Sequence, residues 1–170
     1  RIEVTLFDEM LEVMPNHYTQ SLPKGRLNLF SEGDKMHGKK SFKYIGILKP
    51  EIAKYWSLDE HANKPIVIYN DRKQHIIDRH LKDFGSIEKI DECWNKLSKI
   101  INKPDNVFYN EKTKGLEYYK KIDEEIVVAV RINFSKVLKI RSFYPANKGK
   151  LKNRKKKERK MDKNLENVLL

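Results

Sequence analysis

The stretch that decides the fold is residues 107–144, VFYNEKTKGLEYYKKIDEEIVVAVRINFSKVLKIRSFY. Its apolar pattern has a period of two, which predicts four strands: Val107–Tyr109, Leu116–Ile122, Ile126–Ile132 and Val137–Tyr144. The segments between these strands are short and hold turn-forming residues. Short connections between successive strands mean hairpins, so we expect an antiparallel meander.

The residues before the meander predict helices and two further short strands. Tyr44–Leu48 and the β-branched run Pro65–Tyr69 are typical of strands, and Pro50 suits the first turn of a helix. Either Asn70 or Asp71 can cap the next helix.

That helix should run to about Phe84 and end at Gly85, and Ser86 then caps another helix that ends before Pro104. Helices followed by a meander are the arrangement of the α+β class.

Three stretches of the 170 residues differ in character. Residues 1–41 hold one helical pattern over 6–14 and then a polar run, so we interpret them as a flanking segment. Residues 42–147 are the expected folded unit. Residues 148–170 form a tail whose first part, KGKLKNRKKKERK, holds nine Lys or Arg and one Glu. We expect disorder or a frayed helix there until the tail meets an anion.

Composition narrows the classes of function. Lys and Arg exceed Asp and Glu by 36 to 24, and this charge of +12 favours a phosphate-bearing partner, nucleic acid first. The longest apolar run, Ile126–Val130, is too short for a membrane span, so no membrane partner is expected. A single cysteine, Cys93, excludes an internal disulfide framework and fits a reducing, cytoplasmic compartment.

The segment His75-Ile76-Ile77-Asp78-Arg79-His80 carries the clearest chemistry. On a helix, His75 and Arg79 share a face, while Ile76 and Ile77 belong to a buried stripe. An imidazole can move a proton near neutral pH, and a guanidinium can hold a phosphate. The competing interpretation is that His80 is an ordinary boundary histidine of the core.

Zinc is not expected from these residues. His75 and His80 are five positions apart, which turns them away from each other on a helix, and Cys93 has no neighbouring cysteine. A Gly-rich phosphate loop is also absent from the sequence. We therefore expect no metal and no cofactor.

The last strand is the second candidate site. Alternation places Leu138, Ile140, Ser142 and Tyr144 on one face and Lys139, Arg141 and Phe143 on the other. The second set would hold phosphate and stack a base, with Arg131 of the neighbouring strand as a further phosphate contact. A half-exposed strand with ordinary solvated cations is the alternative.

The basic tail is the third feature. It would add non-specific, salt-dependent attraction to RNA or DNA. A solubilising terminal run, or a linker to another domain, is the structural alternative.

In order along the chain, five segments resemble the phage branch of the barnase–EndoU–colicin–RelE-like nuclease superfamily: Ile45–Leu48, Pro65–Ile68, His75-x-x-x-Arg79-His80, Ile100–Asp105 and Leu138–Tyr144. The resemblance covers roughly residues 42–147, and the histidine helix and Pro104-Asp105 are its most specific parts. It implies helices packed on a four-stranded antiparallel sheet, with metal-independent RNA cleavage.

The resemblance also implies roles for individual residues. The histidine of the family helix corresponds to His75, and Arg79 and His80 complete that motif. The hydroxyl position of the closing strand corresponds to Ser142, followed by Tyr144; family members often have Thr where this chain has Ser142.

The expected reaction is transesterification. His75 would take the proton of a ribose 2′-OH, and Arg79 and Arg141 would stabilise charge on the phosphate. His80 or Tyr144 would protonate the leaving 5′ oxygen, and Ser142 would hydrogen-bond the phosphate. The RNA-binding residues would be Arg131, Lys139, Arg141 and Tyr144.

Similar domains are toxin or effector modules of phage and mobile-element proteins. The resemblance therefore implies that the partner is RNA, with tRNA as one option, and that a cognate immunity protein or antitoxin inhibits the domain. It also implies action in the cytoplasm of a bacterial host. Two alternatives stay open: a nucleic-acid-binding module without catalysis, and a structural adaptor domain of a phage-derived protein.

Overall fold

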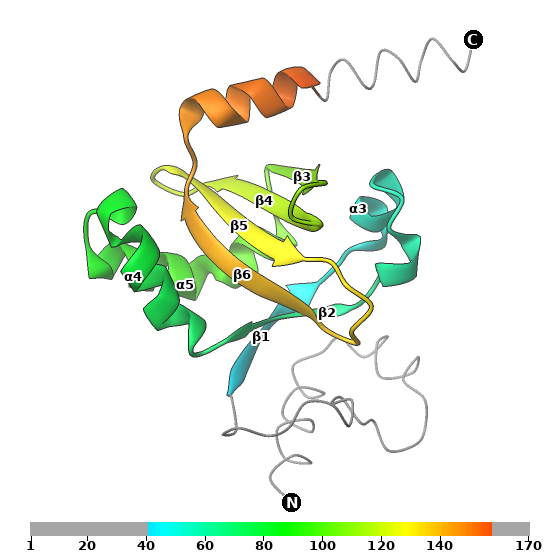
Figure 1. Cartoon of the computed structure of the whole chain (residues 1–170), viewed down its shortest axis with the longest axis horizontal. Coiled ribbons are helices and arrows are strands. Elements are labelled where there is room, and N and C mark those ends of the chain that lie inside the picture. The colour runs from blue at the N-terminus through cyan, green and yellow to red at the C-terminus, as the bar shows by residue number, and fades with distance from the viewer. Residues whose placement is uncertain (1–40, 158–170) are drawn as a thin grey trace, which may run out of the picture.

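The computed structural model describes residues 41–157, so the helical pattern over 6–14 lies outside the described residues. In chain order the elements are β1 Phe42–Ile47, α3 Pro50–Tyr55, the 3₁₀ helix η1 Asp59–His61, β2 Pro65–Tyr69, α4 Arg72–Phe84, α5 Ile87–Asn102, β3 Asn106–Asn110, β4 Gly115–Lys121, β5 Glu125–Arg131 and β6 Leu138–Pro145. Residues 148–157 are helical and follow β6 (Figure 1). None of the described helices is both long and apolar enough to cross a membrane.

The α+β class and the meander β3–β4–β5–β6 are confirmed, but the expected four-stranded antiparallel sheet is wrong. The sheet has six strands in the order β1-β2-β6-β5-β4-β3, and it is mixed because β2 runs parallel to β6. Ile66, Val67 and Ile68 of β2 are almost completely buried. Because a buried backbone must be hydrogen-bonded, β2 pairs with β1 on one side and β6 on the other.

The predicted helix ends are confirmed where local chemistry controls them. Gly85 ends α4 with a left-handed φ of 84°, a conformation that glycine adopts without steric cost. Ser86 caps α5, and its hydroxyl oxygen accepts a hydrogen bond from the Lys89 backbone N–H. Pro50 occupies the first turn of α3, where its missing N–H costs no hydrogen bond.

The sheet has one face covered by α4 and α5, and this inner face carries the main core (Figure 1). Ile76 and Phe84 of α4 and Ile90, Leu97 and Ile101 of α5 are fully or almost fully buried there. The opposite face, called the outer face below, carries a smaller cluster. Its members are Phe108, Tyr119 and Val127, with Trp56, Tyr144, Ala146 and Leu151 packed against them.

The alternation expected along β6 is wrong after Ile140, because the strand contains a bulge. Val130 pairs with Ile140 and Ala129 pairs with Ser142, which leaves Arg141 as an extra residue. The bulge reverses the two faces. Phe143 joins the inner core, 5.9 Å between ring centroids from Phe84, whereas Ser142 lies opposite Ala129 on the outer face.

For the basic run over 148–160 the sequence predicts disorder or a frayed helix, whereas its described part, residues 148–157, is a helix that packs on the sheet. Leu151 of residues 148–157 packs against the outer-face cluster. Because this side chain is the one large apolar residue of the run, it gives the helix a point of attachment to the sheet.

We predict that acidification destabilises the fold through His61. This ring is buried, with Nδ1 2.9 Å from Lys64 Nζ, and burial followed by the Lys64 charge lowers its pKa below the usual 6.5. The unfolded chain therefore binds the proton first, so stability is complete above about pH 6.5 and falls as pH drops toward the folded pKa. Urea unfolding at about pH 7.5 and about pH 5.5 measures the effect.

His61→Gln is the matched variant, because it removes the titration. Its unfolding free energy should change less over the same interval. An equal loss in both proteins would contradict the assignment to His61.

Candidate active site

The contact between β2 and β6 determines where α4 lies. β2 pairs with β6 only at Ile66↔Leu138 and Val67↔Lys139, so no described strand borders the second half of β6 on that side. α4 begins three residues after β2 ends and packs against β6. Side chains of α4 can therefore reach residues near the end of β6.

His80 makes this contact. Its ring is stacked on Tyr144, with centroids 5.2 Å apart and planes 28° apart. On the same helix, His80 Nδ1 lies 2.9 Å from Asp83 Oδ2. A carboxylate accepts, so Nδ1 carries the proton and Nε2 of the neutral ring is left as a proton acceptor. These two contacts fix the orientation of the His80 ring, and they fit both a role in proton transfer and the competing interpretation of a boundary histidine of the core.

The side chains of His75 and Arg79 have fewer contacts with the rest of the candidate site than His80 has. His75 is half-buried and Arg79 is exposed on α4, and neither side chain makes a hydrogen bond or ion pair with another described residue. Within residues 41–157 no hydrogen bond, ion pair or ring contact joins either side chain to Arg141 or Ser142. Their roles in catalysis stay predictions.

The predicted residues of β6 divide into two groups. Lys139 lies opposite Arg131, and its Nζ is 5.1 Å from the centroid of the Tyr69 ring. Five residues along the strand, roughly 15 Å away at the usual strand rise, Tyr144 contacts His80. Between the groups, Arg141 is exposed, and Ser142 Oγ is buried without a hydrogen-bond partner among the described residues.

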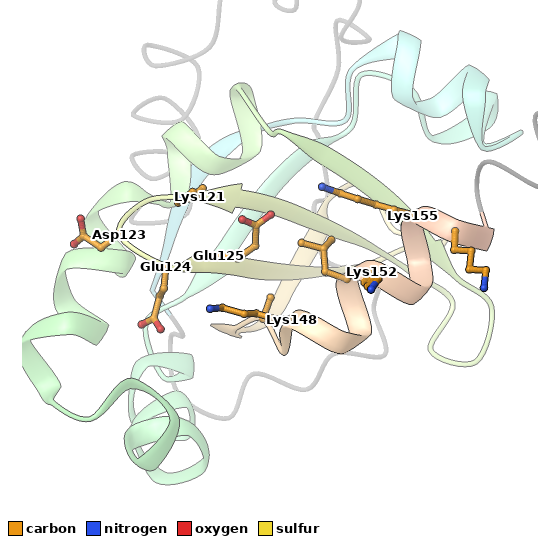
Figure 2. Close-up of a pocket in the computed structure, with 10 residues that line it drawn as sticks. Lys121, Asp123, Glu124, Glu125, Lys148, Lys152 and Lys155 are labelled. Carbon is orange, nitrogen blue, oxygen red and sulfur yellow. The ribbon is translucent and has the colours of Figure 1, made fainter.

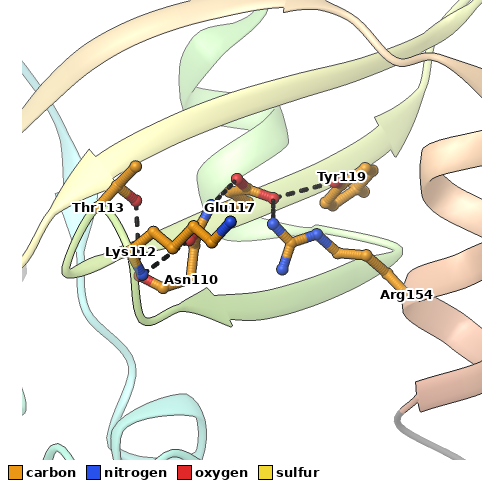
Figure 3. Close-up of polar contacts among 6 residues, drawn as sticks. All are labelled: Asn110, Lys112, Thr113, Glu117, Tyr119 and Arg154. Carbon is orange, nitrogen blue, oxygen red and sulfur yellow. Dashed lines mark hydrogen bonds and ion pairs between the residues drawn. The ribbon is translucent and has the colours of Figure 1, made fainter.

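A cluster that the sequence did not predict occupies the outer face next to Tyr144. Glu117 of β4 is only 4% exposed, yet its carboxylate is fully engaged (Figure 3). Oε1 accepts a hydrogen bond of 2.8 Å from Asn110 Nδ2, and Oε2 accepts one of 3.0 Å from the Tyr119 hydroxyl. Arg154, on the helix of residues 148–157, completes the cluster with a 2.8 Å ion pair to Oε2.

Electrostatics join this cluster to Tyr144, the ring on which His80 stacks. Burial raises the pKa of Tyr144, the Glu117 charge raises it further, and Arg154 partly opposes this. Burial and Glu117 also raise the pKa of Tyr119. Both phenols therefore keep their protons at neutral pH and act as hydrogen-bond donors. Lys150 Nζ lies 5.8 Å from the centroid of the Tyr144 ring and adds a positive charge.

The set that meets here contains an oriented imidazole, a protonated phenol, a guanidinium and a buried carboxylate. Together these groups can transfer protons and hold an anion. Within the described residues, no group of three or more His, Cys, Asp or Glu side chains is placed to hold a metal ion.

The sequence contains a signal for one member of the Glu117 cluster, the carboxylate itself. Glu117 interrupts the strand Leu116–Tyr119 with an acid between apolar and aromatic residues, which indicates a carboxylate that needs partners. Arg154 had no such signal, because it is one of nine cations in a uniformly basic run.

Comparison with known proteins gives one result. Residues 43–153 match the family described as phage-Barnase-EndoU-ColicinE5/D-RelE like nuclease3. The match includes α4, the meander and the first turns of the C-terminal helix. No curated protein and no solved structure gives a significant match.

We predict that Arg154→Ala destabilises the protein by about 1–3 kcal/mol, because it leaves the buried Glu117 carboxylate without its cationic partner. Equilibrium urea unfolding measures the loss. The double variant with Glu117→Gln should lose less than the sum of the two single variants, with a coupling of about 0.5–3 kcal/mol.

Lys157→Ala is the matched control, since it removes an exposed cation of the same helix. Its unfolding free energy should stay within about 0.5 kcal/mol of the parent. Additive effects of Arg154 and Glu117 would show that the ion pair does not hold the helix on the sheet.

Proposed function

The chain belongs to this family of phage barnase–EndoU–colicin–RelE-like nucleases, and from that premise we propose that it is a metal-independent endoribonuclease. The observation that supports the proposal best is His80, which lies between Asp83 and Tyr144 beside a cationic strand. Proton transfer by a positioned imidazole requires no metal, and the flanking cations complement a phosphodiester.

The proposed reaction is an intramolecular transesterification. The base removes the proton of a ribose 2′-OH, and the 2′ oxygen forms a bond to the adjacent phosphorus. The bond from phosphorus to the 5′ oxygen breaks, and a general acid gives that oxygen a proton. The products are a 2′,3′-cyclic phosphate and a 5′-hydroxyl, and neither water nor a redox partner is consumed.

We assign proton transfer first to His80, since its Nε2 is left as an acceptor by the contact with Asp83. Tyr144, protonated at neutral pH and stacked on that ring, is the proposed donor to the leaving oxygen. Arg79 of α4 and Arg141 of β6 are both exposed, and they would hold the phosphate. The unpartnered Ser142 hydroxyl would donate to a phosphate oxygen.

His75 is the alternative base that the family motif favours, and its ring makes no hydrogen bond with a described residue. Separate substitution of His75 and His80 distinguishes which of the two rings acts as the base.

The biological setting is proposed on the same premise. A phage or mobile-element toxin or effector module would act on RNA, tRNA among the options, in the cytoplasm of a bacterial host. A cognate immunity protein or antitoxin would cover the site, and a net charge of +12 favours an acidic inhibitor.

We predict that the purified protein cleaves RNA in the presence of EDTA and leaves 2′,3′-cyclic phosphate ends. His80→Ala should lower the cleavage rate about 10²–10⁴-fold, the usual contribution of a positioned acid or base. Gel analysis of total RNA with end-group identification measures both. A DNA oligonucleotide is the substrate control, because it lacks the 2′-OH.

Two variants sharpen the assignment. Asp83→Asn should reduce the rate less than His80→Ala, since it removes only the orienting carboxylate. A large loss in His75→Ala with none in His80→Ala would transfer the role to His75. Cleavage abolished by EDTA, or no cleavage by the parent protein, would refute the proposed mechanism.

A further inference from the structure

A groove separates the β4–β5 hairpin from the helix of residues 148–157 (Figure 2). Its volume is about 970 Å³, and Ala146 and Leu151 are among its lining residues. The groove lies outside the His80–Tyr144 contact, although its first lining residue after β6, Ala146, is only two positions from Tyr144.

The lining of the groove is mainly cationic. Five ammonium groups compare with three carboxylates, and none of the five makes an ion pair with a described residue. The lysines are Lys121, Lys148, Lys152, Lys155 and Lys156. Their charge is therefore available to an anion from outside the protein.

The carboxylates are concentrated on the hairpin side. Asp123 and Glu124 are exposed in the turn of the hairpin, and Figure 2 shows Asp123 far from Lys155. Glu125 is half-buried at the start of β5. The groove therefore has an acidic end at the hairpin turn and a basic side along the helix.

The helix has two functional sides. Lys150 and Arg154 face the outer-face cluster, through contacts with Tyr144 and Glu117, and Leu151 packs on that cluster while also lining the groove. Lys148, Lys152 and Lys156 are spaced by four and line the groove. The ion pair between Arg154 and Glu117 attaches the helix to the sheet, and it thereby also positions the helix residues that line the groove.

We propose that this groove binds the sugar–phosphate backbone of single-stranded RNA and guides the strand to the His80–Tyr144 contact. The inference deepens the proposed function and rests on it for the identity of the substrate. Lysines on flexible stems neutralise successive phosphates without reading bases, so binding is independent of sequence and sensitive to salt.

The shape and composition of the groove favour a nucleic-acid strand over a membrane. A helix that lies on a membrane inserts large apolar residues into the lipid. Here Leu151, the large apolar residue of the helix, already packs against the sheet, and residues 148–157 include no aromatic residue. A flat lipid surface also cannot enter a recess between a hairpin and a helix.

The test measures binding of the full chain to a fluorescent 2′-O-methyl oligoribonucleotide, which cannot be cleaved because its 2′ oxygen carries a methyl group. The groove variant is Lys148→Gln/Lys152→Gln/Lys156→Gln. Its affinity should fall about tenfold or more. The slope of log K against log salt should become shallower by about 2, since each lost phosphate contact on a single strand accounts for about 0.7.

The matched control is Lys82→Gln/Lys89→Gln/Lys99→Gln, which removes the same charge from exposed positions of α4 and α5. It should bind within about twofold of the parent and with an unchanged salt slope. Asp123→Asn/Glu124→Gln should bind more tightly than the parent, because it removes repulsion at the acidic end. Equal urea midpoints would confirm that all variants are folded.

Equal weakening of the groove and control variants would overturn the proposal, because net charge alone would then explain binding. Loss of binding to phosphatidylserine vesicles, with RNA affinity unchanged, would also overturn it and assign the lysines to a membrane. Catalysis does not enter this readout. A parent protein that binds through the groove but never cleaves RNA refutes only the proposed enzyme, whereas cleavage with an unaffected groove variant refutes only the groove.

Discussion

The parallel pairing of β2 with β6 is the constraint on which the rest of the structure depends. Ile66, Val67 and Ile68 are too apolar for an edge strand, so β2 is held between β1 and β6. This pairing is short, and α4 follows β2 almost at once. The helix therefore packs beside the second half of β6, and His80 stacks on Tyr144, which lies 64 positions further along the chain.

The bulge at Arg141 then decides what the outer face presents. Without the extra residue, Ser142 and Tyr144 would point into the core and Phe143 would point out. With it, Phe143 packs against Phe84, and Tyr144 comes close enough to the buried Glu117 carboxylate for that charge to raise the pKa of the phenol. The one extra residue thus places the polar groups of Ser142 and Tyr144 on the outer face instead of in the core.

The helix of residues 148–157 shows how a highly charged segment can be held by few contacts. Leu151 buries apolar surface, and Arg154 neutralises a carboxylate that is 4% exposed. A buried charge without a partner is costly, so the attraction between Glu117 and the basic segment is stronger than a surface ion pair would be. The five lysines that line the groove make no ion pair with a described residue, so they leave a positive field on this side of the helix.

The sequence by itself determined the local elements and the kind of chemistry, since both depend on neighbouring residues. The period of two predicted the meander, Gly85 and Ser86 marked helix ends, and the resemblance of five segments indicated the nuclease family that the comparison confirms. Glu117 was partly readable as an acid within an apolar strand. Only the tertiary structure decided the parallel β2–β6 pairing, the face of Ser142 and Tyr144, the choice of His80 as the ring with oriented nitrogens, and the partner of Glu117. These features include the strand order, the one-residue bulge and an ion pair across 37 positions. They arise when distant segments pack together, so they cannot be predicted from the periodicity within one segment.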